Sequence, residues 1–109
     1  MPIFLDSHRG AELPMSAVRM FLRAARLGIT DDLGVRPLDL YCGDDGRVFY
    51  VLSAPDEATV RQRHAAEGVV CRRVRRVPSF GSGGTELSVQ ERVVVRDMIA
   101  LEHASATVC

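Results

Sequence analysis

The chain has 109 residues, of which 47% are hydrophobic and 26% are charged, so it has the size and composition of one folded domain rather than of two domains or a disordered protein. Its 14 basic residues, all of them arginine, balance its 14 acidic residues. A balanced charge gives no net field to attract a phosphate polymer or an anionic lipid surface, so we expect neither nucleic acid nor membrane as a partner.

The first part of the chain predicts a strand followed by a helix. Residues 3–8 are an apolar run that turns polar, which is typical of a strand that begins in the core. From Met15 onward, apolar residues recur at spacings of three and four, which places them on one face of a helix capped by Ser16. Gly34 ends this segment.

The middle of the chain predicts a hairpin. Residues 38–42 alternate between apolar and polar, and residues 47–54 are the most hydrophobic strand, suited to the middle of a sheet. Between them, residues 43–46 form a turn that contains Asp-Gly. Pro37 cannot donate a backbone hydrogen bond, so we expect it at an edge or at the start of its strand.

A second helix and a last strand follow the hairpin. The helix is expected from about Pro55 to Glu67, with Gly68 just beyond its end, and the strand over residues 69–77. The order strand, helix, strand, strand, helix, strand predicts an α+β fold, a ferredoxin-like βαββαβ sandwich over residues 1–78. Both helices would then cover one face of an antiparallel sheet. An apolar sheet face left in water predicts a homodimer, a dimeric α+β barrel in which two sheets pack together.

Residues 79–109 form a Gly/Ser linker and a C-terminal extension. Ser88 and Glu91 make a capping box that predicts a short helix over 88–104, although the run of valines there also suits a strand. We expect the last five residues to be disordered. A third reading of the whole chain is an interaction domain whose extension docks on a partner.

The three cysteines are odd in number and lack CxxC spacing, so neither a disulfide framework nor a zinc knuckle is indicated. We expect reduced thiols, with Cys42 and Cys71 inside strands. No segment has the pattern of a secretory signal or the length of a membrane span, which predicts a cytoplasmic protein.

Two pairs of residues could hold a metal ion. Asp6 and His8 point to the same side of the first strand, and His64 and Glu67 share one face of the second helix. A solvated strand end and an ordinary helix terminus are the alternatives. The two imidazoles converge only if the fold brings the strand and the end of the helix together.

The sequence resembles a family of small nickel-binding ferredoxin-like proteins, formerly a domain of unknown function. The resemblance rests on Met-Pro before an apolar strand that ends in Asp6-Ser7-His8, on the stretch 46–55, and on a His shortly before a Gly in residues 64–68. It implies a homodimer that binds a divalent transition metal, nickel, with His8 and His64 as ligands and Asp6 and Glu67 as companions. Relatives carry further histidines where this chain has Phe21-Leu22-Arg23 and Glu67.

No nucleophile elbow, P-loop or dinucleotide fingerprint is present, so we expect a binding protein rather than an enzyme. The alternative is a cofactor-free small-molecule enzyme or ligand-binding module that uses the cavity between sheet and helices. His8, Tyr41, Tyr50 and His64 are its candidate acid–base groups. The arginines of residues 72–76 are interpreted as charges that protect an edge strand from aggregation.

Overall fold

A five-stranded antiparallel sheet forms the centre of the computed structural model, which describes residues 1–79, 86–102 and 104–109. Its strands are β1 (Ile3–Arg9), β2 (Arg36–Gly43), β3 (Arg47–Ser53), β4 (Arg73–Val77) and β5 (Ala106–Val108). They lie in the order β4-β1-β3-β2-β5, and each neighbouring pair is antiparallel. The two most buried strands, β1 and β3, are therefore neighbours near the middle of the sheet.

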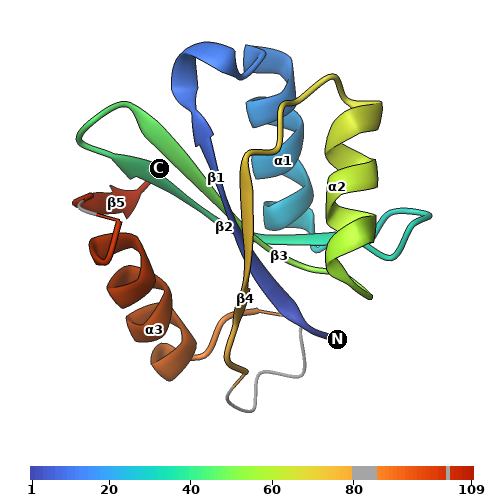
Figure 1. Ribbon diagram of the computed structural model, residues 1–109. Coiled ribbons are helices and arrows are strands. Elements are labelled where there is room, and N and C mark those ends of the chain that lie inside the picture. The colour runs from blue at the N-terminus through green and yellow to red at the C-terminus, as the bar shows by residue number, and fades with distance from the viewer. Residues whose placement is uncertain (80–85, 103) are drawn as a thin grey trace.

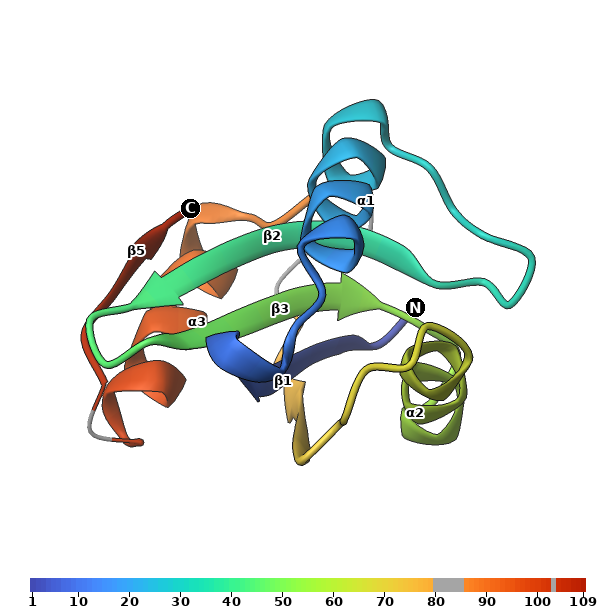
Figure 2. The same cartoon turned by 90° about the horizontal axis from the view of Figure 1, so that it is seen from above.

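Helices cover both faces of this sheet. Helices α1 (Met15–Leu27) and α2 (Glu57–Ala66) lie on one side, and α3 (Val89–Ala100) lies on the other (Figure 1), an arrangement that the view from above repeats (Figure 2). A short 3₁₀ turn, Gly10–Glu12, joins β1 to α1. No helix in the described ranges is long and apolar enough to cross a membrane.

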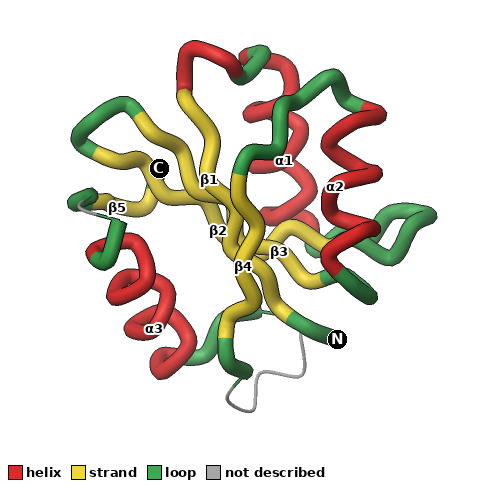
Figure 3. The backbone as a smooth tube through the Cα atoms, in the orientation of Figure 1, coloured by secondary structure: helices red, strands yellow, loops and turns green. Residues whose placement is uncertain are grey.

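From β1 to β4 the elements follow the order strand, helix, strand, strand, helix, strand, and the α+β architecture with an antiparallel sheet is broadly compatible with a ferredoxin-like fold. Several boundaries differ. Helix α1 has its capping position at Pro14, two residues before the expected Ser16, and it ends at Leu27, before Gly28 rather than at Gly34. Strand β4 begins only at Arg73, because residues 67–72 form a loop that turns back from α2 toward the sheet (Figure 3).

The alternation of side chains along β1 and β3 divides the core into two layers. Ile3, Leu5 and Phe49 point toward α3, whereas Phe4 and Tyr50 point toward α1 and α2. Both layers are well buried, since these side chains are at most 5% exposed. A strand that is buried on both faces reads as a continuous apolar run, which is the pattern seen in residues 47–54.

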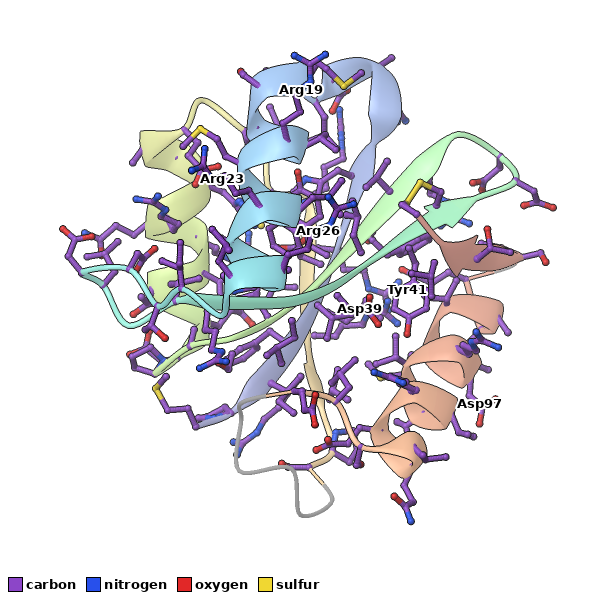
Figure 4. All side chains as sticks on the ribbon, turned by 180° about the vertical axis from the view of Figure 1, so that it is seen from behind. Arg19, Arg23, Arg26, Asp39, Tyr41 and Asp97 are labelled. Carbon is purple, nitrogen blue, oxygen red and sulfur yellow. A yellow bond between two sulfur atoms is a disulfide. The ribbon has the colours of Figure 1, made fainter. Side chains whose placement is uncertain are left out.

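Helix α3 covers the sheet face that was expected to be bare. The Ser88 side chain accepts a hydrogen bond from the Glu91 backbone, and the Glu91 side chain accepts one from the Ser88 backbone, so the predicted capping box and helix are confirmed. Val95 and Ile99 are buried against the layer that contains Tyr41, which lies between β2 and α3 (Figure 4). The premise of the dimer prediction, an uncovered sheet face, therefore does not hold, and the dimer itself stays a prediction.

The C-terminus is tied to the sheet. Strand β5 pairs with the end of β2, with Val108 opposite Tyr41, and a disulfide joins Cys42 to Cys109 with a Cα–Cα distance of 5.3 Å. The predictions of a disordered tail and of reduced thiols at these two cysteines are wrong. The two cysteines are 67 residues apart in the sequence, so the spacing of cysteines along the chain did not predict this disulfide. Cys71 is a free thiol, and it lies in the loop before β4 rather than in a strand.

Three of the four arginines in residues 72–76 form ion pairs within the chain. Arg72 contacts Glu12 at 2.6 Å, and Arg73 and Arg75 contact Glu102 at 3.1 and 2.7 Å. These ion pairs join β4 and the residue before it to other elements, so carboxylates match most of the basic run. The arginines of α1, at positions 19, 23 and 26, lie on its exposed side as predicted (Figure 4). The linker predicted at 79–84 lies, beyond residue 79, outside the described residues.

Candidate metal centre and adjoining cavity

Strand β1 carries two ionisable side chains into the layer beneath α1 and α2. Asp6 and His8 follow Phe4 at intervals of two, so all three point to the same face of the sheet. Asp6 is fully buried and His8 is 2% exposed. The alternative of a solvated strand end is therefore wrong, because the loop after α2 and the helices close over it.

Helix α2 brings the second histidine to the same place. Val60 and His64 are one turn apart and are the buried residues of this helix, which packs them toward the sheet. Asp56 starts the helix by accepting a hydrogen bond from the Thr59 backbone at 2.8 Å. Gly68, with φ of 71°, ends the segment in the left-handed region and turns the chain back.

Asp6 bridges the two imidazoles. Its Oδ1 lies 2.7 Å from Nε2 of His8, and its Oδ2 is hydrogen-bonded to Nε2 of His64. His8 also places Nδ1 2.9 Å from the carbonyl oxygen of Val70. Carboxylate and carbonyl oxygens both accept, so His8 donates from both nitrogens and is an imidazolium.

The pKa values agree with this assignment. Burial alone would lower the pKa of His8, but the hydrogen bond and charge of Asp6, with the Val70 carbonyl, outweigh it and raise that pKa above 6.5. Burial alone would raise the pKa of Asp6, but hydrogen bonds from His64 and His8 and their charges lower it below 3.8. The buried group is thus an ion pair of His8 and Asp6 with a further imidazole attached.

His64 differs from His8 in one respect. Its Nε2 donates to Asp6, whereas its Nδ1 is buried and has no hydrogen-bond partner among the described residues. Because Asp6 takes the proton-bearing nitrogen, Nδ1 is left with a lone pair in the neutral ring. Buried polar atoms are nearly always paired, so this atom is an exception that calls for a physical explanation.

A third donor completes a possible metal site. One ligand atom each from Asp6, His64 and Cys71 lie within 4.8 Å of one another, so in the described part of the chain this group could hold a metal ion. Burial, and after it the charge of Asp6, raise the pKa of the Cys71 thiol to about 11. A thiolate at this position would therefore form on metal binding, by loss of the thiol proton.

The structure brings together three of the four predicted ligands. Asp6, His8 and His64 converge within one chain, and the ring centroids of the two histidines are 5.0 Å apart. Glu67 lies outside the three-donor group and forms an ion pair with Arg63 at 2.9 Å. Cys71 was missed, since a lone cysteine in an assumed strand carries no signal and only the loop between α2 and β4 turns it toward Asp6.

A cavity of about 340 Å³ adjoins the centre on the α1 and α2 side. Apolar side chains from α1, β3 and the segment before β2 line most of it, and His64, Arg63 and Glu67 line the α2 side. Phe21, one of these apolar residues, stacks on Tyr50 with a centroid distance of 4.0 Å. His64 is thus shared by the buried centre and the cavity.

Comparison of the chain with protein-family models, with curated proteins and with solved structures gives no match.

Proposed function

We propose that this protein binds a divalent transition metal ion through Asp6, His64 and Cys71. The observation that carries the proposal is the convergence of a carboxylate, an imidazole and a thiol within 4.8 Å, from a strand, a helix and a loop. Charged and polar groups are costly to bury unless they are paired or hold a metal. Three unlike donors gathered in one place, with Asp6 and His64 buried and Cys71 half-buried, therefore favour a binding role over a purely structural one.

The donor set indicates the class of ion. Imidazole and thiolate suit nickel, copper, zinc and cobalt, whereas calcium and magnesium prefer oxygen ligands alone. Nickel is the ion implied by the sequence resemblance, and the identity of the ion depends on that resemblance. Among the donors, Asp6 and the Cys71 thiolate would together balance the charge of a divalent ion.

His8 acts on the metal through Asp6. Its Nε2 holds Oδ1 of Asp6 at 2.7 Å, and its Nδ1 is anchored by the Val70 carbonyl. Partners of this kind fix the orientation of a ligating carboxylate, and their loss typically weakens metal binding roughly 10–100-fold. His8 is therefore assigned to positioning Asp6 while His64 and Cys71 bind the ion directly.

Calorimetric titration of chelator-treated protein with Ni²⁺ and Zn²⁺ tests the proposal. We expect one ion per chain, with affinity that rises with pH because the thiol must lose its proton. Co²⁺ should give a thiolate-to-metal charge-transfer band in the wild type that is absent in Cys71→Ser. Absence of binding heat, or a Cys71→Ser variant that binds as the wild type does, would contradict the proposal.

Glu67→Gln is the matched control. Glu67 is the predicted ligand that pairs with Arg63 outside the three-donor group, so we expect its amide variant to keep the metal affinity of the wild type. A large loss of affinity in Glu67→Gln would add this residue to the ligand set.

Two further expectations belong to this proposal. The homodimer implied by the resemblance is tested by light scattering, where the mass of one chain would count against it. The cytoplasmic location is tested by fractionation of the source cells. Disulfides persist mainly in oxidising compartments, so the Cys42–Cys109 bond weighs against that location.

A further inference from the structure

The cavity between α1 and α2 has a buried apolar part and an exposed apolar rim. Its volume of about 340 Å³ lies at the lower end of the roughly 300–1,000 Å³ range of ligand pockets. Of its lining residues, Phe21 and Leu52 are buried, whereas Met20 and Ile29 are 61% and 47% exposed. Large apolar side chains left in water favour the binding of an apolar body that covers them.

Two arginines and two carboxylates line this cavity, and three of these four charges are paired with one another. Arg63 contacts Asp31 at 3.1 Å and Glu67 at 2.9 Å. Arg23 is an exposed residue of α1 and forms no ion pair within the described parts of the chain. It lies on the side of α1 that faces α2 (Figure 4). Arg23 is therefore the charge of this cavity that remains for a ligand.

Helix α1 adds further positive charge near the rim. Arg19 and Arg26 lie one turn to either side of Arg23 on the exposed side of the helix (Figure 4), and α1 contains no acidic residue. Neither Arg19 nor Arg26 forms an ion pair with a described residue. Arginines this close together attract anions over about a Debye length, roughly 10 Å at 0.1 M salt. The exposed side of the cavity therefore favours a negatively charged group.

We infer that this cavity binds a compact apolar carboxylate, with its hydrocarbon body against Phe21 and Leu52 and its carboxylate on the guanidinium group of Arg23. The two oxygens of a carboxylate match the fork of N–H donors that an arginine presents. At the rim the carboxylate keeps part of its hydration, so binding does not bury an unpaired charge. An amine would instead approach the arginines of α1 and compete with Arg63 for its carboxylate partners. This inference goes beyond metal binding and is independent of it, because it concerns the metal-free protein.

The experiment compares three probes of similar shape and different charge. Beta-naphthoate carries a carboxylate, beta-naphthamide is neutral, and beta-naphthylmethylamine carries an ammonium group. The fluorescence of each reports its binding to metal-free protein that has its disulfide intact and from which the chelator has been removed. We expect naphthoate to bind about tenfold more tightly than the amide, which corresponds to one charge-assisted pair at a partly exposed site, and the amine to bind most weakly. Naphthoate that does not bind, or that binds no more tightly than the amide or the amine, would overturn the inference.

Two charge variants test the contact with Arg23. Arg23→Gln removes the positive charge at an exposed position, and we expect it to bind naphthoate and the amide with similar affinity. Arg26→Gln is the matched control, because it removes the same charge from the same helix at a residue that is not part of the cavity lining. We expect this control to keep most of the preference for naphthoate. An equal loss of preference in the two variants, or none in Arg23→Gln, would refute the role of Arg23.

A second pair of variants locates the binding. Ala24→Phe places a ring in the cavity from α1, and we expect it to abolish binding of naphthoate and of the amide. Ser16→Phe is the matched control, because it adds the same ring at an exposed position of the same helix that is not part of the cavity lining. Melting temperatures check that both variants fold. Naphthoate bound by Ala24→Phe as tightly as by the wild type would show that the probe binds elsewhere and would contradict the inference.

Discussion

Replacing Asp6 by asparagine tests the buried ion pair directly. The amide has the shape of the carboxylate, but it offers one acceptor where His8 and His64 present two N–H donors. One imidazole must therefore turn its lone pair toward the amide nitrogen. For His8 this means loss of its charge, since its other nitrogen still donates to the Val70 carbonyl.

The expected loss of unfolding free energy in Asp6→Asn follows from the burial of Asp6 and His8. Asp6 is fully buried and His8 is 2% exposed, so water does not compensate the lost charge. Removing one partner of a buried ion pair costs about 3–5 kcal/mol, and the amide recovers part of this through its remaining hydrogen bonds. We expect Asp6→Asn to lose about 3 kcal/mol of unfolding free energy, which lowers the urea midpoint by roughly 1.5–2 M.

Urea unfolding of the chelator-treated, oxidised protein, followed by circular dichroism, measures this change. Asp45→Asn is the matched control, since Asp45 forms its ion pair with Arg47 at the surface of the hairpin turn. We expect this control to unfold close to the wild-type midpoint. An Asp6→Asn midpoint equal to that of the wild type would show that the buried carboxylate does not stabilise the fold.

Three further predictions use the same assay. The pKa of His8 is raised above 6.5, so its contribution to stability is complete below pH 6.5 and is lost as the pH rises through the folded-state value; His8→Gln should flatten this alkaline loss. The Cys42–Cys109 bond spans 67 residues, and its reduction should cost about 4 kcal/mol; an unchanged midpoint in dithiothreitol would contradict this. Ile99→Ala should cost about 3 kcal/mol, since Ile99 is 1% exposed, whereas Val93→Ala, at a position 53% exposed, should cost little.

The local pattern of the chain predicted most of the fold. Periodicity located β1, α1, the hairpin and α2, because amphipathic spacing and turn residues act over a few positions. The helix after Ser88 was predicted from its capping residues. The packing of that helix could not be predicted, since the sequence does not show which sheet face a segment joined by a polar linker will reach.

The candidate site was predicted only in part, because local sequence patterns determine some of its contacts and the path of the chain determines the others. Asp6 and His8 are neighbours on one strand, so their common face follows from the strand alone. His64 required the fold to bring α2 over β1, which the ferredoxin-like resemblance implied. Cys71 and the Cys42 disulfide depend on loop and tail paths with no local signal, and they were either missed or wrongly assigned.

The two faces of the sheet differ in the polarity of their buried clusters. On the α3 side the buried cluster is apolar and makes a conventional core. On the other side three ionisable groups are buried, which adds little net stability compared with apolar packing. The α3 layer offsets this cost, so that β1 can hold Asp6 and His8 away from water. In Asp6, His8 and His64 each side-chain nitrogen and oxygen has a hydrogen-bond partner except Nδ1 of His64, which has none among the described residues.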